Sequence, residues 1–381
     1  MEFELNSSQI KMQRRFRDFA ENMVKPLARE IDEDQRFPEE TVDKLGKIGW
    51  LGLPFNKELG GQGFDTLTYI LCIEELSKVC ASTGVIVSTH TSLCGDAINC
   101  FGTEGQKKIY LHKLAEGIKL GAFALTEPES GSDLSHLQTT AIANEDCYII
   151  NGTKTFITNT GYADYYIVFA STDTKKGTKG ISAFIVDKND TGFSIGRLIR
   201  KMGIRGSATH EIILNNCAVS KERLLGEIDH GYRIAMQILD GGRIGIAAQA
   251  LGIAEGALDE TVTFCKERRQ FGKTIADFQN TQFEFASMKT RIEAARFLVY
   301  RAAVAKDSGR PFSQEAAIAK LFASDTAMDT TIRCVQLHGG RGYTQDFPVE
   351  RMMRDAKITQ IYEGTNEIQK IIIASRTINE R

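Results

Sequence analysis

The chain lacks the features that mark membrane, secreted or nucleic-acid-binding proteins. No apolar run approaches the roughly 20 residues that a membrane span needs, and the start, MEFELNSSQIKMQRRF, contains no apolar signal core. The formal net charge is −2 and the pI about 6.4, so no basic field favours general nucleic-acid binding. We therefore expect no membrane span, no nucleic-acid partner and a cytoplasmic location.

Metal-binding and nucleotide-binding signatures are also missing. The eight cysteines form no Cys-x-x-Cys pair and no tight Cys/His cluster; they lie at positions 72, 80, 94, 100, 147, 217, 265 and 334. Free, buried thiols in a reducing compartment are the expected state, and we expect no metal site. The sequence also contains no Rossmann fingerprint, P-loop, His-Glu-x-x-His or Gly-x-Ser-x-Gly motif.

What is present predicts a large α+β protein that is mostly α. The chain has 381 residues, of which 42% are apolar and 25% charged, which suits two or three structural units with a sizeable core. Apolar residues recur at helical spacing in residues 10–24, 66–80, 106–116, 285–302 and 316–334. β-branched and aromatic residues gather instead in residues 165–170, 181–186 and 211–214. We expect helical domains over 1–120 and 231–381 and a β domain over 121–230.

One local signal predicts a hairpin inside the β domain. Asn151-Gly152 lies between two strand-like runs, and this dipeptide is the strongest short hairpin signal in the chain. We therefore expect a tight turn at these two residues.

The segment Ile361–Gln369 is the most informative candidate for chemistry. Glu363 lies between an aromatic residue, Tyr362, and Gly364. The aromatic wall can desolvate the carboxylate and raise its pKa toward the range that suits a general base. The alternative is an ordinary helix start with Thr365 as N-cap. The two interpretations are compatible, because a helix cap can also present a catalytic group.

Four further segments each have a functional and an ordinary interpretation. Leu125–Asp133 offers hydroxyls and backbone donors to a phosphate or a heterocycle, but a polar turn is favoured locally. Glu267–Lys273 has arginine forks that can grip phosphate, or is a solvated turn. Gln336–Tyr343 has three glycines within four residues, or simply a glycine helix cap. Asp240–Arg243 has two glycines in a helical pattern, each costing about 1 kcal/mol relative to Ala, which indicates a packing or ligand reason.

Together these residues resemble the acyl-CoA dehydrogenase family over essentially the full length. The ordered set is specific, although each member alone is weak: Leu125-Thr126-Glu127-Pro128 with Ser130-Gly131-Ser132, then Phe156-Ile157-Thr158-Asn159, Arg268–Phe271, Gly339-Gly340 and Ile361–Ile368. Leu239–Gly252 is most similar to the short-chain, butyryl-CoA type.

The resemblance implies a fold and an activity. The fold is an N-terminal helical domain, a middle β-barrel-like domain and a C-terminal helical bundle. The protein would bind FAD, form a homotetramer as a dimer of dimers, oxidise a short-chain acyl-CoA to its trans-2-enoyl-CoA and pass electrons to an electron-transferring flavoprotein. Glu363 would take the pro-R α-proton while the β-hydrogen leaves as hydride to flavin N5. Its backbone N–H and a flavin ribityl hydroxyl would hold the thioester oxygen.

The resemblance also assigns binding residues. The FAD contacts would be Phe123, Leu125, Thr126, Ser132, Phe156, Ile157, Thr158, Arg268, Gln270, Phe271, Phe278, Gln279, Gln336, Gly339, Gly340, Thr365 and Glu367. Among them, Arg268, Gln270, Phe271, Gln336, Gly339 and Gly340 would reach the FAD of a neighbouring subunit. Thr365 and Glu367 would bind its pyrophosphate and adenine side. Many relatives have Trp at the position of Phe156. The substrate contacts would be Ser132, Tyr232, Leu239, Asp240, Arg243 and Gly364.

Two comparisons within the family indicate a simple aliphatic acyl chain. Isovaleryl-type enzymes carry their base on the helix near Arg243, where this chain has Gly242. Glutaryl-type enzymes use an arginine in the stretch that matches Gly84–Leu93, which here contains no Arg or Lys. C4 is the first expectation, with C4–C5 and branched chains next. The alternatives are a physiological enoyl-CoA (crotonyl-CoA) reductase in an anaerobe, an acyl-CoA oxidase, whose members are usually longer, and a non-catalytic acyl-CoA or flavin-binding scaffold.

Overall fold

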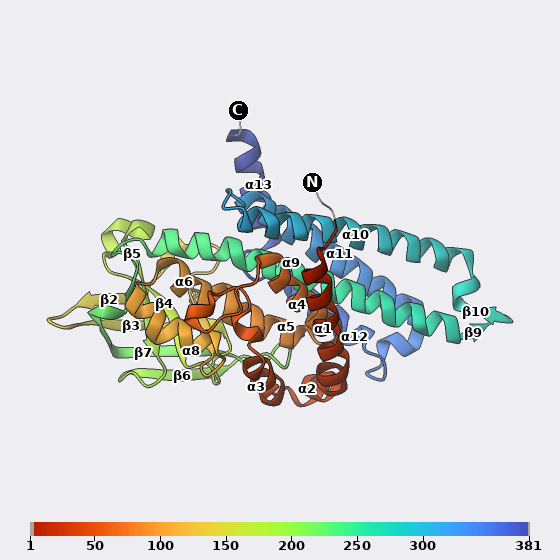
Figure 1. Cartoon of the computed structure of the whole chain (residues 1–381), viewed down its shortest axis with the longest axis horizontal. Coiled ribbons are helices and arrows are strands. Elements are labelled where there is room, and N and C mark those ends of the chain that lie inside the picture. Colours follow the sequence, from red (N-terminus) through yellow and green to blue (C-terminus); the bar gives the residue numbers. More distant parts are fainter. Residues whose placement is uncertain (1–3, 380–381) are drawn as a thin grey trace.

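The computed structural model describes residues 4–379 and shows helices, then strands, then helices along the chain (Figure 1). The change to strands occurs between Ala115 and Gly121, and the change back to helix between Leu225 and Gly231. This order confirms the predicted fold class. We propose domain boundaries near residues 120 and 230.

The N-terminal unit is built from two helices of 13 and 14 residues, α1 and α4, and several shorter ones. Its α-helices are α1 Ser7–Phe19, α2 Ala28–Asp34, α3 Glu39–Lys47, α4 Thr66–Val79, α5 Ala81–Ser88, α6 Asp96–Phe101, α7 Glu104–Gln106 and α8 His112–Ala115. The wider π-helical segment Thr89–Gly95 joins α5 to α6. Asp65 caps α4, accepting a hydrogen bond from the Thr68 N–H at 2.7 Å. The helices predicted over 10–24, 66–80 and 106–116 are confirmed, the first and last with π-helical turns inside them.

The C-terminal unit contains α9 Gly231–Glu267, α10 Gln279–Asp307, α11 Ser313–His338, α12 Val349–Ile358 and α13 Asn366–Asn379. At about 1.5 Å per residue, the 37 residues of α9 span about 55 Å. Figure 1 shows α9 crossing the whole molecule, with a hairpin of β9 Arg269–Gln270 and β10 Lys273–Thr274 at its far end. Every residue from 241 to 254 is buried, as expected for a helix that is covered on all sides.

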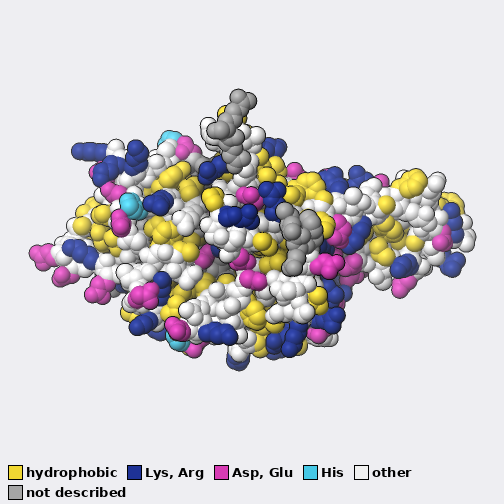
Figure 2. Space-filling model, turned by 45° about the horizontal axis from the view of Figure 1, so that its top comes forward, with side chains coloured by type: hydrophobic (Ala, Val, Ile, Leu, Met, Phe, Trp, Pro, Cys, Tyr) yellow, Lys and Arg dark blue, Asp and Glu magenta, His cyan; other side chains and the backbone are white. Residues whose placement is uncertain are grey.

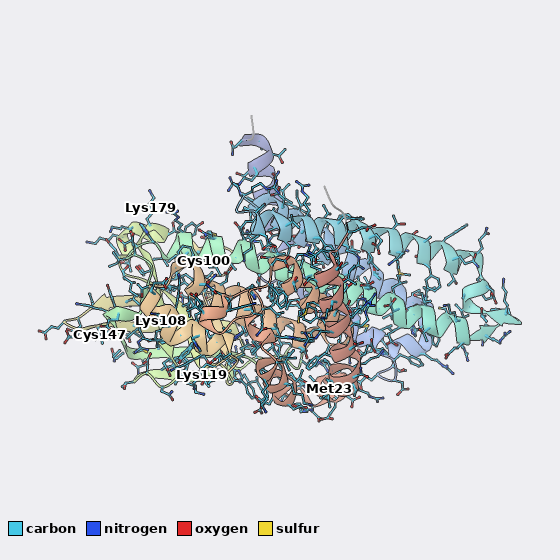
Figure 3. The ribbon with its side chains drawn as sticks, in the orientation of Figure 1. Met23, Cys100, Lys108, Lys119, Cys147 and Lys179 are labelled. Atoms are coloured by element: carbon cyan, nitrogen blue, oxygen red, sulfur yellow. The ribbon has the colours of Figure 1, made fainter. Side chains whose placement is uncertain are left out.

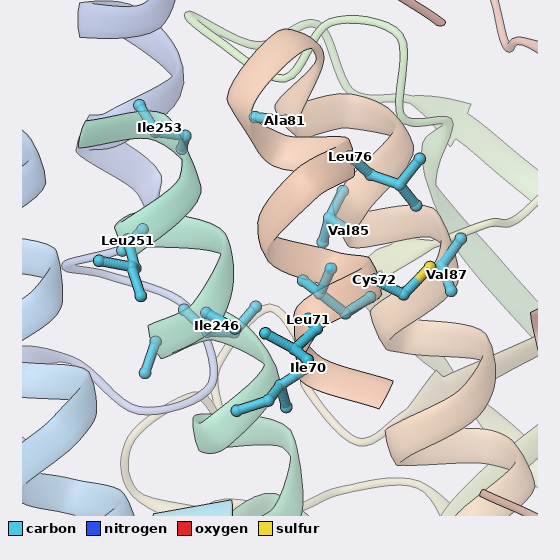
Figure 4. Close-up of a cluster of buried hydrophobic side chains, with 14 of the residues drawn as sticks. Ile70, Leu71, Cys72, Leu76, Ala81, Val85, Val87, Ile246, Leu251 and Ile253 are labelled. Carbon is cyan, nitrogen blue, oxygen red and sulfur yellow. The ribbon is translucent and has the colours of Figure 1, made fainter. Parts of the chain in front are cut away.

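Helices α4, α5 and α9 share one apolar core (Figure 4). Ile70 and Leu71 of α4, Val85 of α5 and Ile246 of α9 are all at most 1% exposed. Full burial of such side chains stabilises the fold by about 1.5–3 kcal/mol each. The helices also approach closely, because a Cβ at Gly252 of α9 would lie 2.3 Å from the Glu74 carbonyl oxygen. This packing fixes α5 and the segment after it beside α9.

The middle unit is a mixed sheet of eight strands. The strands are β1 Gly121–Ala124, β2 Thr140–Ala143, β3 Cys147–Thr158, β4 Tyr165–Ser171, β5 Ile181–Asp187, β6 Phe193–Leu198, β7 Thr209–Ser220 and β8 Leu224–Leu225. They pair in the order β6-β7-β3-β2-β4-β5-β8, with β1 parallel to β4. β6 and β8 are unpaired on their outer sides within the described residues, so the sheet is curved but open.

The central strand β4 is buried on both faces. Tyr165, Ile167 and Phe169 pack with the helices α6, α8 and α9, whereas Tyr166 and Val168 pack inside the sheet. The alternation follows from the two-residue period of a strand. The strands predicted at 165–170 and 181–186 are confirmed.

The predicted hairpin at Asn151-Gly152 is wrong. Strand β3 runs through both residues, and the register with β7 shifts between Ile150 and Gly152. Asn151 uses its side chain across the sheet, accepting a hydrogen bond from the Asn216 N–H at 2.7 Å. A Cβ at Gly152 would lie 2.3 Å from the Thr139 hydroxyl oxygen. The dipeptide therefore forms a β-bulge, and the turn between β2 and β3 lies earlier, where Asn144 N–H donates to Cys147 O at 2.8 Å.

All eight cysteines are free thiols, and six of them are buried. Figure 3 places the exposed Cys100 on α6 and the half-buried Cys147 at the start of β3. Among residues 4–379, no helix is long and apolar enough to cross a membrane. The same residues contain no group of three or more His, Cys, Asp or Glu side chains arranged to hold a metal ion.

Candidate active site

Glu363 lies in the short turn between α12 and α13, against α9. Its φ is 50°, and the φ of the following Gly364 is 92°. A left-handed backbone is uncommon for a residue with a Cβ and persists only where the surroundings hold it. Within the described residues, the Glu363 N–H donates no hydrogen bond. The turn thus presents both a carboxylate and a free backbone donor.

The Glu363 side chain is half-buried, and its Oε2 atom is fully enclosed. Its Oε2 atom has no hydrogen-bond partner among the described residues. Burial raises the pKa of Glu363 to about 7, which is the direction predicted from the sequence, while the charges of Lys320 and Arg243 partly oppose the rise. A carboxylate of this kind can accept a proton near neutral pH.

Gly242 of α9 faces this carboxylate. A Cβ at residue 242 would lie 2.2 Å from Glu363 Oε2 and 2.7 Å from Leu93 Cδ2. At the neighbouring Gly241, the nearest atom would be the flexible Lys306 Nζ at 3.0 Å. The packing reason predicted for the glycine pair is therefore confirmed at Gly242. Positions 242 and 363 face each other, so a side chain at 242 would displace the Glu363 carboxylate.

Arg243 and Asp240, both assigned to CoA by the resemblance, pair with each other. Arg243 is only 4% exposed and forms an ion pair with Asp240, which also accepts a hydrogen bond from the Ser313 hydroxyl at 3.1 Å. Arg243 Nε is buried without a partner among the described residues. Leu239, half-buried, and Tyr232, exposed, lie on the same helix toward its start.

Lys320 of α11 is a site residue that the sequence analysis missed. Its side chain is completely buried, and Nζ donates to the Gly364 carbonyl at 2.7 Å and to Asn366 Oδ1 at 3.0 Å. The available signal was a lysine on a helix face otherwise made of small residues, at Ala316, Ala323 and Ser324. A cation on such a face is unusual unless it has a buried partner.

Gln249 and two serines were missed as well. Tyr362 donates its hydroxyl hydrogen bond to Gln249 Oε1, and Gln249 Nε2 donates to the Ala81 carbonyl at 2.9 Å. Ser88 and Ser92 approach α9 at Gly245, where a Cβ would lie 2.5 Å and 3.5 Å from their hydroxyl oxygens. The Tyr362 hydroxyl therefore meets a polar amide, so its surroundings are not purely apolar.

The segment Leu125–Asp133 is a rigid turn fixed to β3. Glu127 and Ser130 exchange two backbone hydrogen bonds. The buried Lys154 Nζ donates to Leu125 O at 3.1 Å and Glu127 Oε1 at 2.7 Å. The Thr155 N–H donates to Thr126 O at 2.9 Å. These contacts leave Gly131 and Ser132 exposed at the surface.

Phe156 offers an open aromatic face beside this turn. It is 63% exposed, has φ 58° and lies at a break in the pairing of β3 with β7. Phe123, Leu125 and Ile157 are buried, so their side chains serve the core and their backbone atoms are the groups available to a ligand. Thr126 and Thr158 are half-buried.

A second set of predicted residues lies far from Glu363 within one chain. Arg268, Gln270 and Phe271 occupy the hairpin after α9, and 25 residues of helix separate Arg268 from Arg243, about 37 Å. Phe278 packs edge-on against Phe271, with ring centroids 6.4 Å apart, and Gln279 begins α10. Gln336 lies in the last turn of α11, about 24 Å along that helix from Lys320, and Gly339 and Gly340 follow the end of the helix.

Two glycines have no explanation within the chain. Gly131 and Gly340 have ordinary φ values, and a Cβ at either would meet nothing within 4 Å. Both lie in segments that the resemblance assigns to FAD. With the exposed rings of Phe156 and Phe271, they fit the close approach of a large flat group from outside the chain.

The start of α13 fits a phosphate. The helix begins at Asn366, and Thr365 Oγ1 accepts from the Ile368 N–H at 3.4 Å, as predicted for an N-cap. Free N–H groups and the helix dipole favour an anion here. Because the Glu367 carboxylate is exposed at the same turn and would repel a phosphate, its backbone N–H is the group suited to that contact.

A hollow of ≈ 370 Å³ elsewhere does not belong to this site. Arg17, Lys78 and Arg296 line it with Glu255 and Glu293. Their charges are already paired, for example Arg17 with Glu75 at 2.9 Å and Lys78 with Glu255 at 2.8 Å. Glu255 lies about three helical turns along α9 from Arg243.

Comparisons with known proteins agree along the whole chain. Three family models match: the N-terminal domain of acyl-CoA dehydrogenase over residues 6–118, the middle domain over 122–217 and the C-terminal domain over 229–378. The chain is 55% identical, over 99% of both sequences, to a short-chain-specific acyl-CoA dehydrogenase of Clostridium acetobutylicum.

Two solved structures have nearly the same fold. One is the butyryl-CoA dehydrogenase of Megasphaera elsdenii, with a TM-score of 0.98 and 48% identity over 100% of both chains. The other is a chain of a structure that concerns the electron transferring flavoprotein of Acidaminococcus fermentans and flavin-based electron bifurcation, with a TM-score of 0.98 and 51% identity, again over 100% of both chains.

Proposed function

This chain belongs to the acyl-CoA dehydrogenase family of FAD-dependent oxidoreductases, and we propose that it dehydrogenates a short-chain acyl-CoA to the trans-2-enoyl-CoA. The observation that carries the proposal is Glu363, a carboxylate with a buried, unpaired oxygen and a pKa near 7. An α-proton beside a thioester is too weakly acidic for a solvated carboxylate to remove, so the base must be desolvated.

Glu363 serves the reaction with two groups. Its Oε2 atom takes the α-proton, and its backbone N–H donates to the thioester oxygen and stabilises the negative charge that develops there. In this proposal the left-handed turn at Glu363 and Gly364 presents both groups to the same thioester. Gly242 leaves the room that the carboxylate needs.

When bound, FAD supplies the acceptor for the β-hydrogen, which leaves as hydride. Phe156, Thr126 and Thr158 would bind the flavin, with Ser132 close by. Thr365 and the N-terminus of α13 would bind the pyrophosphate. Arg268, Gln270, Phe271, Gln336, Gly339 and Gly340 would hold the FAD of a second copy, because they lie too far from Glu363 of their own chain.

A short aliphatic acyl chain is the proposed substrate. Leu93 and α9 lie next to Glu363, because a Cβ at Gly242 would be 2.7 Å from Leu93 Cδ2. The buried stretch from Gly84 to Leu93 carries no Arg or Lys to hold a second carboxylate. The relative that is specific for short chains and the butyryl-CoA dehydrogenase structure support a C4 chain.

The proposed partners are an electron-transferring flavoprotein and three further copies of this chain. A flavoprotein partner is supported by the subject of the Acidaminococcus structure. Figure 2 shows hydrophobic side chains on the surface of the arm formed by the far parts of α9 and α10. Phe271, at the tip, and Phe283, in the first turns of α10, are exposed. Such a surface favours association between copies. The eight free thiols support a reducing, cytoplasmic location.

The test is an anaerobic spectral titration. The purified protein should show a flavin spectrum that bleaches when butyryl-CoA is added, and less so with longer or branched acyl-CoAs. Bleaching only with branched C4–C5 substrates would move the assignment to a branched short-chain dehydrogenase. A protein that cannot be loaded with FAD would contradict the enzyme assignment and favour a scaffold.

A second candidate is the reverse reaction, reduction of an enoyl-CoA in an anaerobe. The likeness to a chain in a structure that concerns electron bifurcation favours it. The same residues serve both directions, since Glu363 can return the proton that it removes. Rates with butyryl-CoA and an oxidised flavoprotein, compared with crotonyl-CoA and the reduced flavoprotein, separate the two directions.

A further inference from the structure

We propose that Lys320 is a positioning residue for the base, and that its ammonium group holds the Glu363–Gly364 turn in place and supplies the positive charge that keeps Glu363 ready to accept a proton. The inference rests on the proposed function, because it concerns the same base. It assigns Lys320 no contact with substrate or cofactor.

The geometry of Lys320 is that of a clamp. The side chain is 0% exposed and comes from the middle of α11, a 26-residue helix. Nζ donates to the Gly364 carbonyl at 2.7 Å, and the same carbonyl accepts from Gln369 Nε2 at 2.8 Å. Gly364 is therefore held from α11 and from α13 at once. This explains how the left-handed backbone at Glu363 persists.

A buried network fixes the second contact of Lys320. Asn366 Oδ1 accepts from Lys320 Nζ at 3.0 Å and from the Ser324 hydroxyl at 3.1 Å. Asn366 Nδ2 donates to Asp325 Oδ1 at 2.8 Å, and that oxygen also accepts from Gln360 Nε2 at 2.7 Å. Ser324 and Asp325 are consecutive residues on α11, about one helical turn after Lys320. The polar atoms of Asn366 are thus paired, which makes the cluster rigid.

The largest electrostatic attraction on Lys320 comes from Glu363. No carboxylate of the described residues lies within ion-pair distance of Nζ, whose hydrogen bonds go to neutral oxygens. The charged groups that face it are Glu363 in the turn, Arg243 on α9, Asp325 on its own helix and Glu367 on α13. Attraction to Glu363 is the largest influence that keeps Lys320 charged, and it offsets the desolvation of the buried ammonium group only in part.

The pKa values show what loss of the lysine would do. Burial lowers the pKa of Lys320 to about 7, and burial raises the pKa of Glu363 to about 7. The Lys320 charge is the largest influence that lowers the pKa of Glu363. Without it, the Glu363 pKa rises further, so the base stays protonated, and inactive, up to a higher pH.

The experiment compares FAD-loaded wild type with Lys320→Met, which keeps the length of the side chain without its charge and donors. The pH profile of kcat for butyryl-CoA is measured, and the Glu363 carboxyl band is titrated by infrared difference spectroscopy without substrate, using Glu363→Gln to identify it. We expect both midpoints to rise by about one pH unit or more. We expect kcat at pH 7 to fall about tenfold or more, because the base is also less well placed.

Two further variants decide the outcome. Lys78→Met removes another largely buried lysine, on α4, which pairs with Glu255 instead; its midpoints should match the wild type. If Lys320→Met does not fold, Asn366→Leu removes the oxygen that holds Nζ, and its midpoints should rise in the same direction. Unchanged midpoints and kcat in the folded variant would overturn the inference. A wild type that is inert to butyryl-CoA would contradict the proposed function, and the infrared titration would still test the clamp.

Discussion

Two places in this chain share one unusual backbone and differ in everything around it. Glu363 and Gly364 have φ values of 50° and 92°, and Phe271 and Gly272 have 51° and 79°. At Phe271 the pair forms the two-residue turn between β9 and β10, where two left-handed residues suit the twist of a hairpin. Glu363 does not lie in a hairpin between paired strands, and hydrogen bonds from α11 and α13 to Gly364 hold its backbone instead.

The surroundings show what each place is built for. The Glu363 turn is enclosed by Lys320, Arg243 and Gly242 of the same chain, so one chain completes it. Phe271 is 93% exposed, and a Cβ at Gly272 would meet nothing within 4 Å. The backbone of the hairpin tip is therefore held by the pairing of β9 with β10, whereas the ring of Phe271 has most of its surface exposed. Changes at Glu363 should alter chemistry, and changes at the tip should alter what binds from outside.

The largest expected effect is that of Glu363→Gln. The amide keeps the size of the side chain but cannot accept the α-proton, so reduction of the flavin by butyryl-CoA should slow by about 10²- to 10⁴-fold. The flavin spectrum and the oligomeric state should stay as in the wild type. Stopped-flow absorbance measures the rate. Turnover that survives the change would show that another group is the base.

Gly242→Ala tests whether space, rather than charge, limits the enclosed site. The new methyl group would lie 2.2 Å from Glu363 Oε2, so the carboxylate has to move by an ångström or more. We expect kcat to fall by about 10- to 100-fold with FAD still bound. In Gly241→Ala, one residue earlier on α9, the methyl group would lie 3.0 Å from Lys306 Nζ and 3.5 Å from Asp96 Oδ2 and would not touch Glu363, so kcat should stay nearly unchanged. Equal losses in the two variants would contradict the steric account.

The sequence predicted the elements that carry a strong local period and the residue whose neighbours are unusual. The long helices and β4 follow from the spacing of apolar residues. The aromatic residue and the glycine that flank Glu363 single it out as the candidate base. The hairpin at Asn151-Gly152 failed because pairing of β3 with β7, a long-range contact, overrode a local turn signal.

Lys320 and Gln249 could not be predicted in the same way. Each is one polar residue in a regular helix, and its meaning lies in a partner far along the chain. Lys320 bonds to Gly364, 44 residues away, and Gln249 to Tyr362, 113 residues away. Helical periodicity says that such a position is buried, but not which group it meets there. The hairpin tip at Phe271 is the opposite case. Its backbone conformation is fixed by residues that are neighbours in the sequence, but the group that it is proposed to contact belongs to another copy of the chain.

Phe271→Ala and Gly340→Ala test the exposed side of the comparison. If a second copy's FAD lies against these residues, either change should weaken FAD retention by about tenfold, the loss expected from one aromatic contact or one close approach. FAD release is measured by fluorescence after dilution, and the oligomeric state by light scattering. The pH midpoint for Glu363 should not move. A shifted midpoint would mean that the hairpin tip influences the Glu363 carboxylate, so that the two places do not act independently.

The smallest effect concerns stability, and it separates the two places by pH. Glu363 has an ordinary pKa of 4.5 when unfolded and about 7 when folded. Between these values the folded chain binds the extra proton, so stability falls as pH rises from about 4.5 to 7 and stays lower above that.

Glu363→Gln removes this penalty, because its amide carries no charge to bury. Its Tm should exceed that of the wild type by roughly 2 °C or more at pH 8, and the gap should nearly close at pH 5. Phe271→Ala has no titrating group, so any change in its Tm should be the same at both pH values. Differential scanning fluorimetry of the FAD-loaded, substrate-free proteins measures all three. A Tm difference between Glu363→Gln and wild type that is the same at pH 5 and pH 8 would mean that burial of the Glu363 charge costs the folded chain no stability. The enclosed turn would then not differ from the exposed tip in this respect.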